Sequence, residues 1–203
     1  MCTVRRSVRA RGSGVSSPAL TRWGGAACLA GLSYGALGYL DDPDSPAFVV
    51  GTVVPALELS TPALFLGGLL GLYSWLGGVG GRLRGTGLVV GMLGLVVGML
   101  GTVLGVVQGL NWWPTLPYLE NWLIPLFAGL AVVGAATLLF EEAQRLFLGA
   151  MVLASATLGW VSLLTDPAFP GVLVSARAVH VGFAALFCMS AIAWGWTLFR
   201  GTP

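Results

Sequence analysis

The sequence predicts an all-α membrane protein: a bundle of six transmembrane helices with both ends of the chain in the cytoplasm (N-in/C-in). Hydrophobic residues make up 56% of the 203 residues and charged residues only 9%, whereas about a quarter of a typical soluble domain is charged. Six apolar stretches approach the length of about 20 residues with which a helix crosses the hydrocarbon of a bilayer. The basic residues gather on one side of these stretches, as they do in membrane proteins of defined orientation.

The six apolar stretches divide the chain into a short tail and one transmembrane domain. Residues 1–20 are rich in Arg, Ser and Gly, and we expect them to form a disordered basic cytoplasmic tail. Residues 21–203 form the transmembrane domain, in which short connections join consecutive helices into three helical hairpins. The predicted spans lie near residues 23–40, 59–77, 87–110, 121–140, 146–164 and 178–199.

One further apolar run, residues 47–57, precedes the second span. Three interpretations are open: the run extends the second helix, tilts it, or lies along the membrane interface. Pro55 and Pro62 favour a break in this region, because proline lacks the N–H that the helical hydrogen bond requires.

The orientation follows from the arginines, which account for all ten basic residues. Positive charge concentrates in the cytoplasmic segments of membrane proteins. With the N-terminus inside, only Arg177 falls on the outer side, and the remaining arginines fall on the inner side. These are Arg5, Arg6, Arg9, Arg11, Arg22, Arg82, Arg84, Arg145 and Arg200. We therefore expect a multi-pass protein of a bacterial plasma membrane whose Arg-rich N-terminus binds anionic lipid headgroups.

The third span carries a stripe of glycines spaced alternately four and three residues apart. They are Gly87, Gly91, Gly94, Gly98, Gly101 and Gly105. An average spacing of 3.5 residues keeps all of them on one face of a helix, where another backbone can approach closely. One interpretation is a seam between two copies of the chain or a sliding surface in a transporter. The interpretation that we favour is a buried helix packed inside one subunit, since such seams are general packing devices in membranes.

A second pattern suggests that the hairpin is repeated three times. Each predicted outer turn contains P-x-x-P, and each helix that follows contains a Leu-Phe pair. The pairs are Leu64 and Phe65, Leu126 and Phe127, and Leu186 and Phe187. The alternative is that the outer turns use proline simply to end one helix and to start the next.

Polar residues at the predicted outer helix ends form a candidate pocket. These are Glu58, Gln108, Asn111, Glu120, Arg177 and His180. In such a pocket, Arg177 would neutralise a carboxylate and His180 would exchange protons near physiological pH. The alternative, which we favour, is that they serve separately as interfacial anchors and helix caps, because a carboxylate stabilises the positive N-terminus of a helix.

Several kinds of site do not fit the sequence. A single histidine excludes a bis-histidine haem within the chain and most His-rich metal sites. Cys2, Cys28 and Cys188 show no C-x-x-C spacing and are expected to pack as small apolar side chains. We expect no cofactor, no metal and no catalytic residue. A nucleic-acid partner is also not expected, because no second basic patch accompanies the tail.

The sequence thus favours a non-enzymatic membrane protein that acts through helix packing or through a partner, with a homo-oligomer as one form of that interaction. The alternative function is a small-solute or proton-linked transporter or channel with an outward-facing polar pocket. A membrane enzyme would need His180 together with Glu58 or Glu120 as its reacting groups, and we rank it last.

Overall fold

The computed structural model describes residues 18–40, 46–76, 81–108, 123–140, 143–165 and 177–200. Within these ranges the chain is almost entirely helical and contains no β-strand, which confirms the predicted all-helical fold. The part of the predicted tail before residue 18 lies outside the described residues, while Pro18 opens the first helix.

Six long helices correspond one by one to the six apolar stretches. A short helix and a 3-10 turn, α1 (Pro18–Arg22) and η1 (Trp23–Gly25), lead into the first long helix, and a π-helical turn, η2 (Val49–Val53), leads into the second. The long helices are α2 (Ala26–Leu40), α3 (Val54–Trp75), α4 (Gly81–Gln108), α5 (Leu123–Phe140), α6 (Ala143–Thr165) and α7 (Arg177–Arg200).

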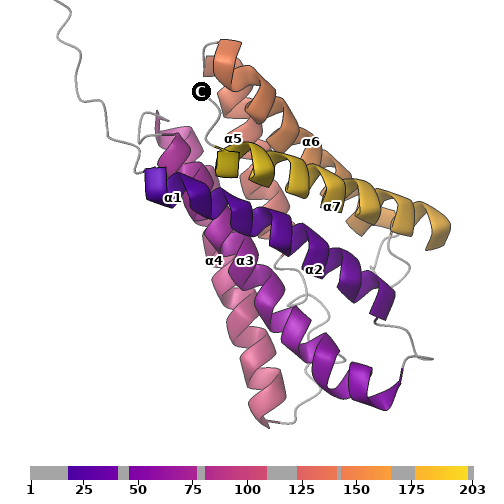
Figure 1. The fold of residues 1–203 in the computed structure, drawn as a ribbon. Helices are drawn as coiled ribbons and strands as arrows, with labels where there is room; N and C mark the ends of the chain where they lie inside the picture. Colours follow the sequence, from indigo (N-terminus) through magenta and orange to yellow (C-terminus); the bar gives the residue numbers. More distant parts are fainter. Residues whose placement is uncertain are drawn as a thin grey trace, which may run out of the picture.

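The helices form a closed ring. Each of α3, α4, α5 and α6 packs against the helix before it and the helix after it, and α7 closes the ring by packing against α2. Consecutive helices run in opposite directions (Figure 1). The first residues of α2, α4 and α6 and the last residues of α3, α5 and α7 therefore lie at the same end of the bundle. We call it the N-terminal end. The other end of the bundle is called the opposite end.

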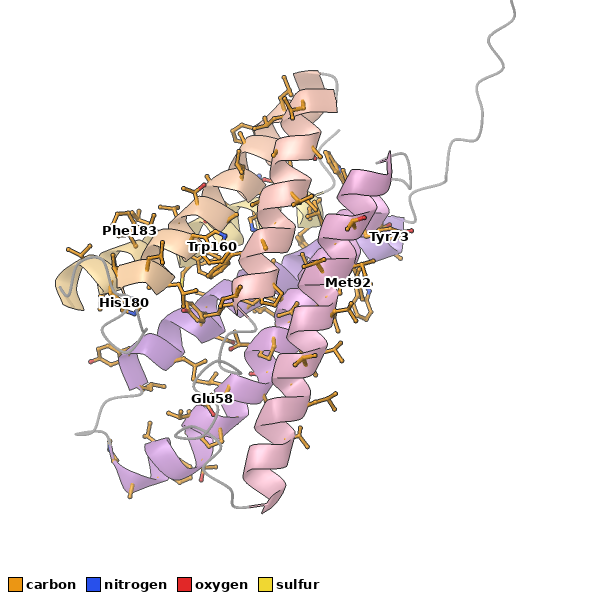
Figure 2. All side chains as sticks on the ribbon, turned by 180° about the vertical axis from the view of Figure 1, so that it is seen from behind. Glu58, Tyr73, Met92, Trp160, His180 and Phe183 are labelled. Carbon is orange, nitrogen blue, oxygen red and sulfur yellow. The ribbon has the colours of Figure 1, made fainter. Side chains whose placement is uncertain are left out.

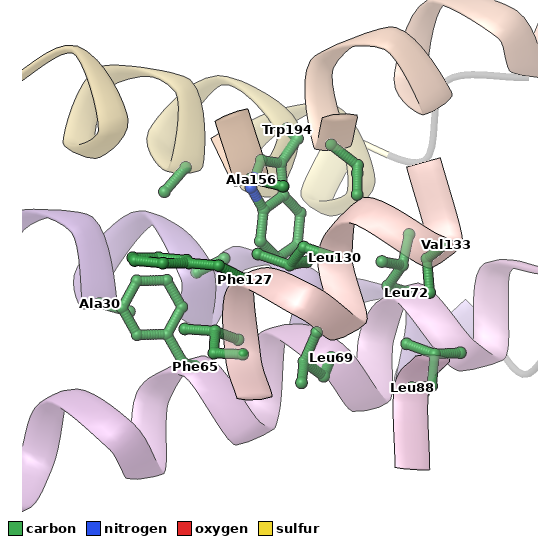
Figure 3. Packing of buried hydrophobic residues seen from close by; sticks show 14 of the residues in the cluster. Ala30, Phe65, Leu69, Leu72, Leu88, Phe127, Leu130, Val133, Ala156 and Trp194 are labelled. Atoms are coloured by element: carbon green, nitrogen blue, oxygen red, sulfur yellow. The ribbon is translucent and has the colours of Figure 1, made fainter. Parts of the chain in front are cut away.

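Three phenylalanines meet inside the ring. The ring centroid of Phe187 on α7 lies 5.1 Å from that of Phe127 on α5 and 5.8 Å from that of Phe65 on α3. All three side chains are buried, and Figure 3 shows Phe65 and Phe127 among the surrounding aliphatic side chains. They are the phenylalanines of the three Leu-Phe pairs, so equivalent positions of the three hairpins meet at one place.

Aromatic side chains from neighbouring hairpins cover two of these rings. Tyr34 on α2 meets Phe187 edge-on at 5.6 Å between centroids, and Trp160 on α6 meets Phe127 at 6.2 Å. The three hairpins are α2–α3, α4–α5 and α6–α7. Each of these two contacts joins the first helix of one hairpin to the second helix of the neighbouring hairpin in the ring. Edge-on aromatic contacts of this kind stabilise a core beyond the burial of their area.

The expected break at Pro55 and Pro62 is wrong, because the chain is helical without interruption from residue 47 to residue 75. Pro55 is the second residue of α3 and follows the π-helical turn η2 directly. Pro62 is inside the helix. Just before Pro62, the hydroxyl groups of Thr61 and Ser60 donate hydrogen bonds to the carbonyl of Leu57, at 2.7 and 3.2 Å. Proline is tolerated inside membrane helices, where local π-helical adjustments help to accommodate it.

Three helical segments are long and apolar enough to cross a membrane. They are Gly51–Trp75, Leu146–Thr165 and Val179–Arg200. The apolar segments Gly85–Gly101 of α4 and Leu123–Leu139 of α5 are shorter.

The outward face of α4 is a ridge of exposed aliphatic side chains, which we call the α4 ridge. It consists of Val89, Val90, Leu93, Val96, Val97, Leu100 and Val103. Soluble proteins rarely expose a continuous apolar surface of this extent, whereas lipid tails solvate it well. This exposed apolar surface is compatible with a lipid environment.

Candidate functional site

Glu58 lies inside a helix and not at its start. The helix already runs for three turns before this residue, and the first turn of α3 contains no acidic residue. The interpretation of Glu58 as a helix cap is therefore wrong. The side chain is half-buried on α3 (Figure 2) and belongs to the segment Gly51–Trp75. A carboxylate within such a segment is costly, by about 2.5–3.5 kcal/mol at the bilayer centre, and commonly marks a functional position.

His180 is bound to the neighbouring helix of its hairpin. Its Nδ1 lies 2.9 Å from the carbonyl oxygen of Ser162 on α6. Because a carbonyl can only accept, Nδ1 carries a proton and donates it in this hydrogen bond. The hydrogen bond thus fixes the orientation of the imidazole.

Ser162 lies in a small polar cluster at the end of α6. Its carbonyl also accepts a hydrogen bond of 3.0 Å from the hydroxyl of Thr165, which donates to the Val161 carbonyl as well. The hydroxyl of Ser162 is buried and has no hydrogen-bond partner. An unpaired buried hydroxyl costs about 1–3 kcal/mol.

The other members of the predicted pocket are placed only by their helices. Gln108 ends α4 and Arg177 begins α7, so both stand at the opposite end of the bundle, with His180 in the first turn of α7. Glu58 lies further inside, about three turns from the start of its helix. Asn111 and Glu120 lie outside the described residues, and convergence of the six residues around a single pocket stays a prediction.

The glycine stripe of α4 packs against α5 along its first turns. A methyl group added at Gly87 would lie 2.9 Å from the carbonyl oxygen of Gly129, and one at Gly91 would lie 3.2 Å from a methyl carbon of Leu69 on α3. Gly94 and Gly98 are buried. A methyl group at Gly101 would meet no atom within 4 Å, and the surroundings of Gly105 are outside the described part of the chain. The stripe therefore belongs to the interior of the bundle at its start, and its use as a seam between copies stays a prediction.

A second glycine seam, between α2 and α7, was not predicted. A methyl group at Gly195 would lie 2.9 Å from the backbone nitrogen of Cys28, and the thiol of Cys28 donates to the carbonyl of Ile192 at 3.2 Å. A methyl group at Gly31 would lie 2.8 Å from the carbonyl oxygen of Cys188. The sequence held a signal for this seam, because small residues at positions 24, 28, 31 and 35 repeat the spacing of the α4 stripe.

Arginine and aromatic side chains gather at the N-terminal end of the bundle. The guanidinium carbon of Arg200 stands 4.6 Å from the ring centroid of Trp196, and that ring stacks on Phe199. Arg22 and Trp23 are exposed where α1 meets η1. Three further arginines begin helices at the same end: Arg82 and Arg84 in α4 and Arg145 in α6.

Among the described residues, no group of three or more His, Cys, Asp or Glu side chains is placed to hold a metal ion. The chain matches no protein-family model, no curated protein and no solved structure. The functional proposal therefore depends on the residues of this chain alone.

Proposed function

We propose that this chain is an integral membrane protein that crosses a bacterial plasma membrane six times. The observation that carries the proposal is the apolar outward surface of the bundle, above all the α4 ridge. Unpaired backbone groups that face lipid are not tolerated in hydrocarbon, and helices avoid them by pairing their backbone groups internally. The shorter helices can cross because the bilayer thins locally around them, at a modest free-energy cost for each ångström of hydrophobic mismatch.

The placement of arginine supports an orientation with the N-terminal end of the bundle in the cytoplasm. Arg22, Arg82, Arg84, Arg145 and Arg200 all belong to helix ends at this end of the bundle. Arg177 alone begins a helix at the opposite end. This is the distribution that the positive-inside rule associates with the cytoplasmic face.

The protein acts through packing and interaction in the membrane rather than through catalysis. Large aromatic side chains fill the axis of the ring, where Phe65, Phe127 and Phe187 are in contact. Glycine contacts bring the backbones of α2 and α7, and of α4 and α5, close together. A bundle so packed is a rigid body that presents apolar helix faces, chiefly the α4 ridge, to lipid or to another membrane helix.

Crosslinking on α4 tests the interaction. Single cysteines are introduced in a variant that lacks the native cysteines: Leu100→Cys on the α4 ridge and Leu95→Cys as its matched control, since Leu95 is buried on the same helix. We expect Leu100→Cys to crosslink reproducibly in native membranes, to a second copy or to one defined partner, and Leu95→Cys not to crosslink. If neither variant crosslinks and mild detergent returns only monomer without a partner, the interaction role is refuted.

A second function, a proton-linked or small-solute transporter, is favoured by one group of observations. Glu58 lies in the segment Gly51–Trp75, soon after the π-helical turn η2, and π-helical turns are frequent at functional sites. His180, which is oriented by its hydrogen bond to the carbonyl of Ser162, stands in the same half of the bundle. Reconstituted vesicles test this function. We expect a proton or solute flux that Glu58→Gln abolishes. Ser60→Ala, two residues away on the same helix, is the control and should preserve the flux. An equal flux in empty vesicles would refute the transporter function.

A further inference from the structure

We draw no further inference here: the strongest candidate, the α4 ridge beside Gly101, where an added methyl group would meet no atom within 4 Å, is an exposed apolar face, and nothing in the described part of the chain shows whether lipid or another helix covers it.

Discussion

Gly129 is the residue at which two helix backbones come closest in the α4–α5 pair. A methyl group on it would overlap the carbonyl oxygen of Gly87 and would lie 3.0 Å from the Cα of Gly91. Both obstacles are backbone atoms, which cannot move aside as the end of a flexible side chain can. Such close contact drives helix association in lipid, where burial of apolar area adds little.

The first prediction concerns this contact. Gly129→Ala should lower the free energy of unfolding by about 1–3 kcal/mol, as overpacking does in well-packed cores. Gly182→Ala is the matched control, because a methyl group there meets nothing within 4 Å; alanine should be neutral or should stabilise its helix by up to about 1 kcal/mol. Thermal unfolding in one mild detergent compares the two variants, and equal midpoints would show that α4 and α5 do not touch here.

The second prediction concerns the aromatic centre. Phe187→Ala removes a buried ring that contacts both Phe65 and Phe127, so it should cost about 3–5 kcal/mol, the usual loss for a buried phenylalanine. Phe147→Ala provides the control, because that ring is 68% exposed and contributes little to packing within the chain. Reversible unfolding in mixed micelles measures both, and a small loss for Phe187→Ala would mean that the three rings do not meet.

At the scale of the helices, the apolar runs of the sequence locate α2, α5, α6 and α7 to within three residues at each end, whereas α4 begins six residues before its predicted span. The start of the second long helix differs more, because proline reads as a helix breaker, whereas the helix here continues through Pro55 and Pro62 after a π-helical turn. That extension changes the meaning of Glu58, which the sequence suggested as a cap. The candidate site was therefore only partly predictable, since its geometry depends on where one helix begins.

The third prediction tests which helix faces meet lipid. Leu93→Arg changes a leucine in the middle of α4 that is 59% exposed, and Leu139→Arg changes one near the end of α5 that is 73% exposed. In a bilayer, Leu93→Arg should cost about 2.5–3.5 kcal/mol and reduce the inserted fraction strongly. Arg at position 139 can extend its charge to the headgroups and should be tolerated. The inserted fraction after alkaline extraction reports both, and two neutral outcomes would indicate a water-facing surface.

At the scale of the whole molecule, the ring closes through contacts between the first and last long helices. The α2–α7 register cannot be read from one sequence, because nothing local encodes which residues meet across the chain. The Leu-Phe pairs suggested only that the hairpin is repeated three times. That their phenylalanines meet at the centre of the ring is a finding of the structure, which the sequence did not predict.

The last prediction concerns the orientation of the whole bundle in the membrane. If the N-terminal end faces the cytoplasm, a reporter inserted after residue 80 or residue 142 stays inside, and one inserted after residue 115 or residue 171 is exported. The physical reason is that arginines flank the inner turns, at Arg82, Arg84 and Arg145, and translocating them against the membrane potential is unfavourable. Paired reporters that are active only inside and only outside measure each site. Replacing Arg82 and Arg84 by Gln should produce a minority of molecules with inverted orientation, whereas Arg177→Gln should increase the fraction in the native orientation. Export of the reporter at residue 80 in the unmodified chain would show that the proposed orientation is wrong.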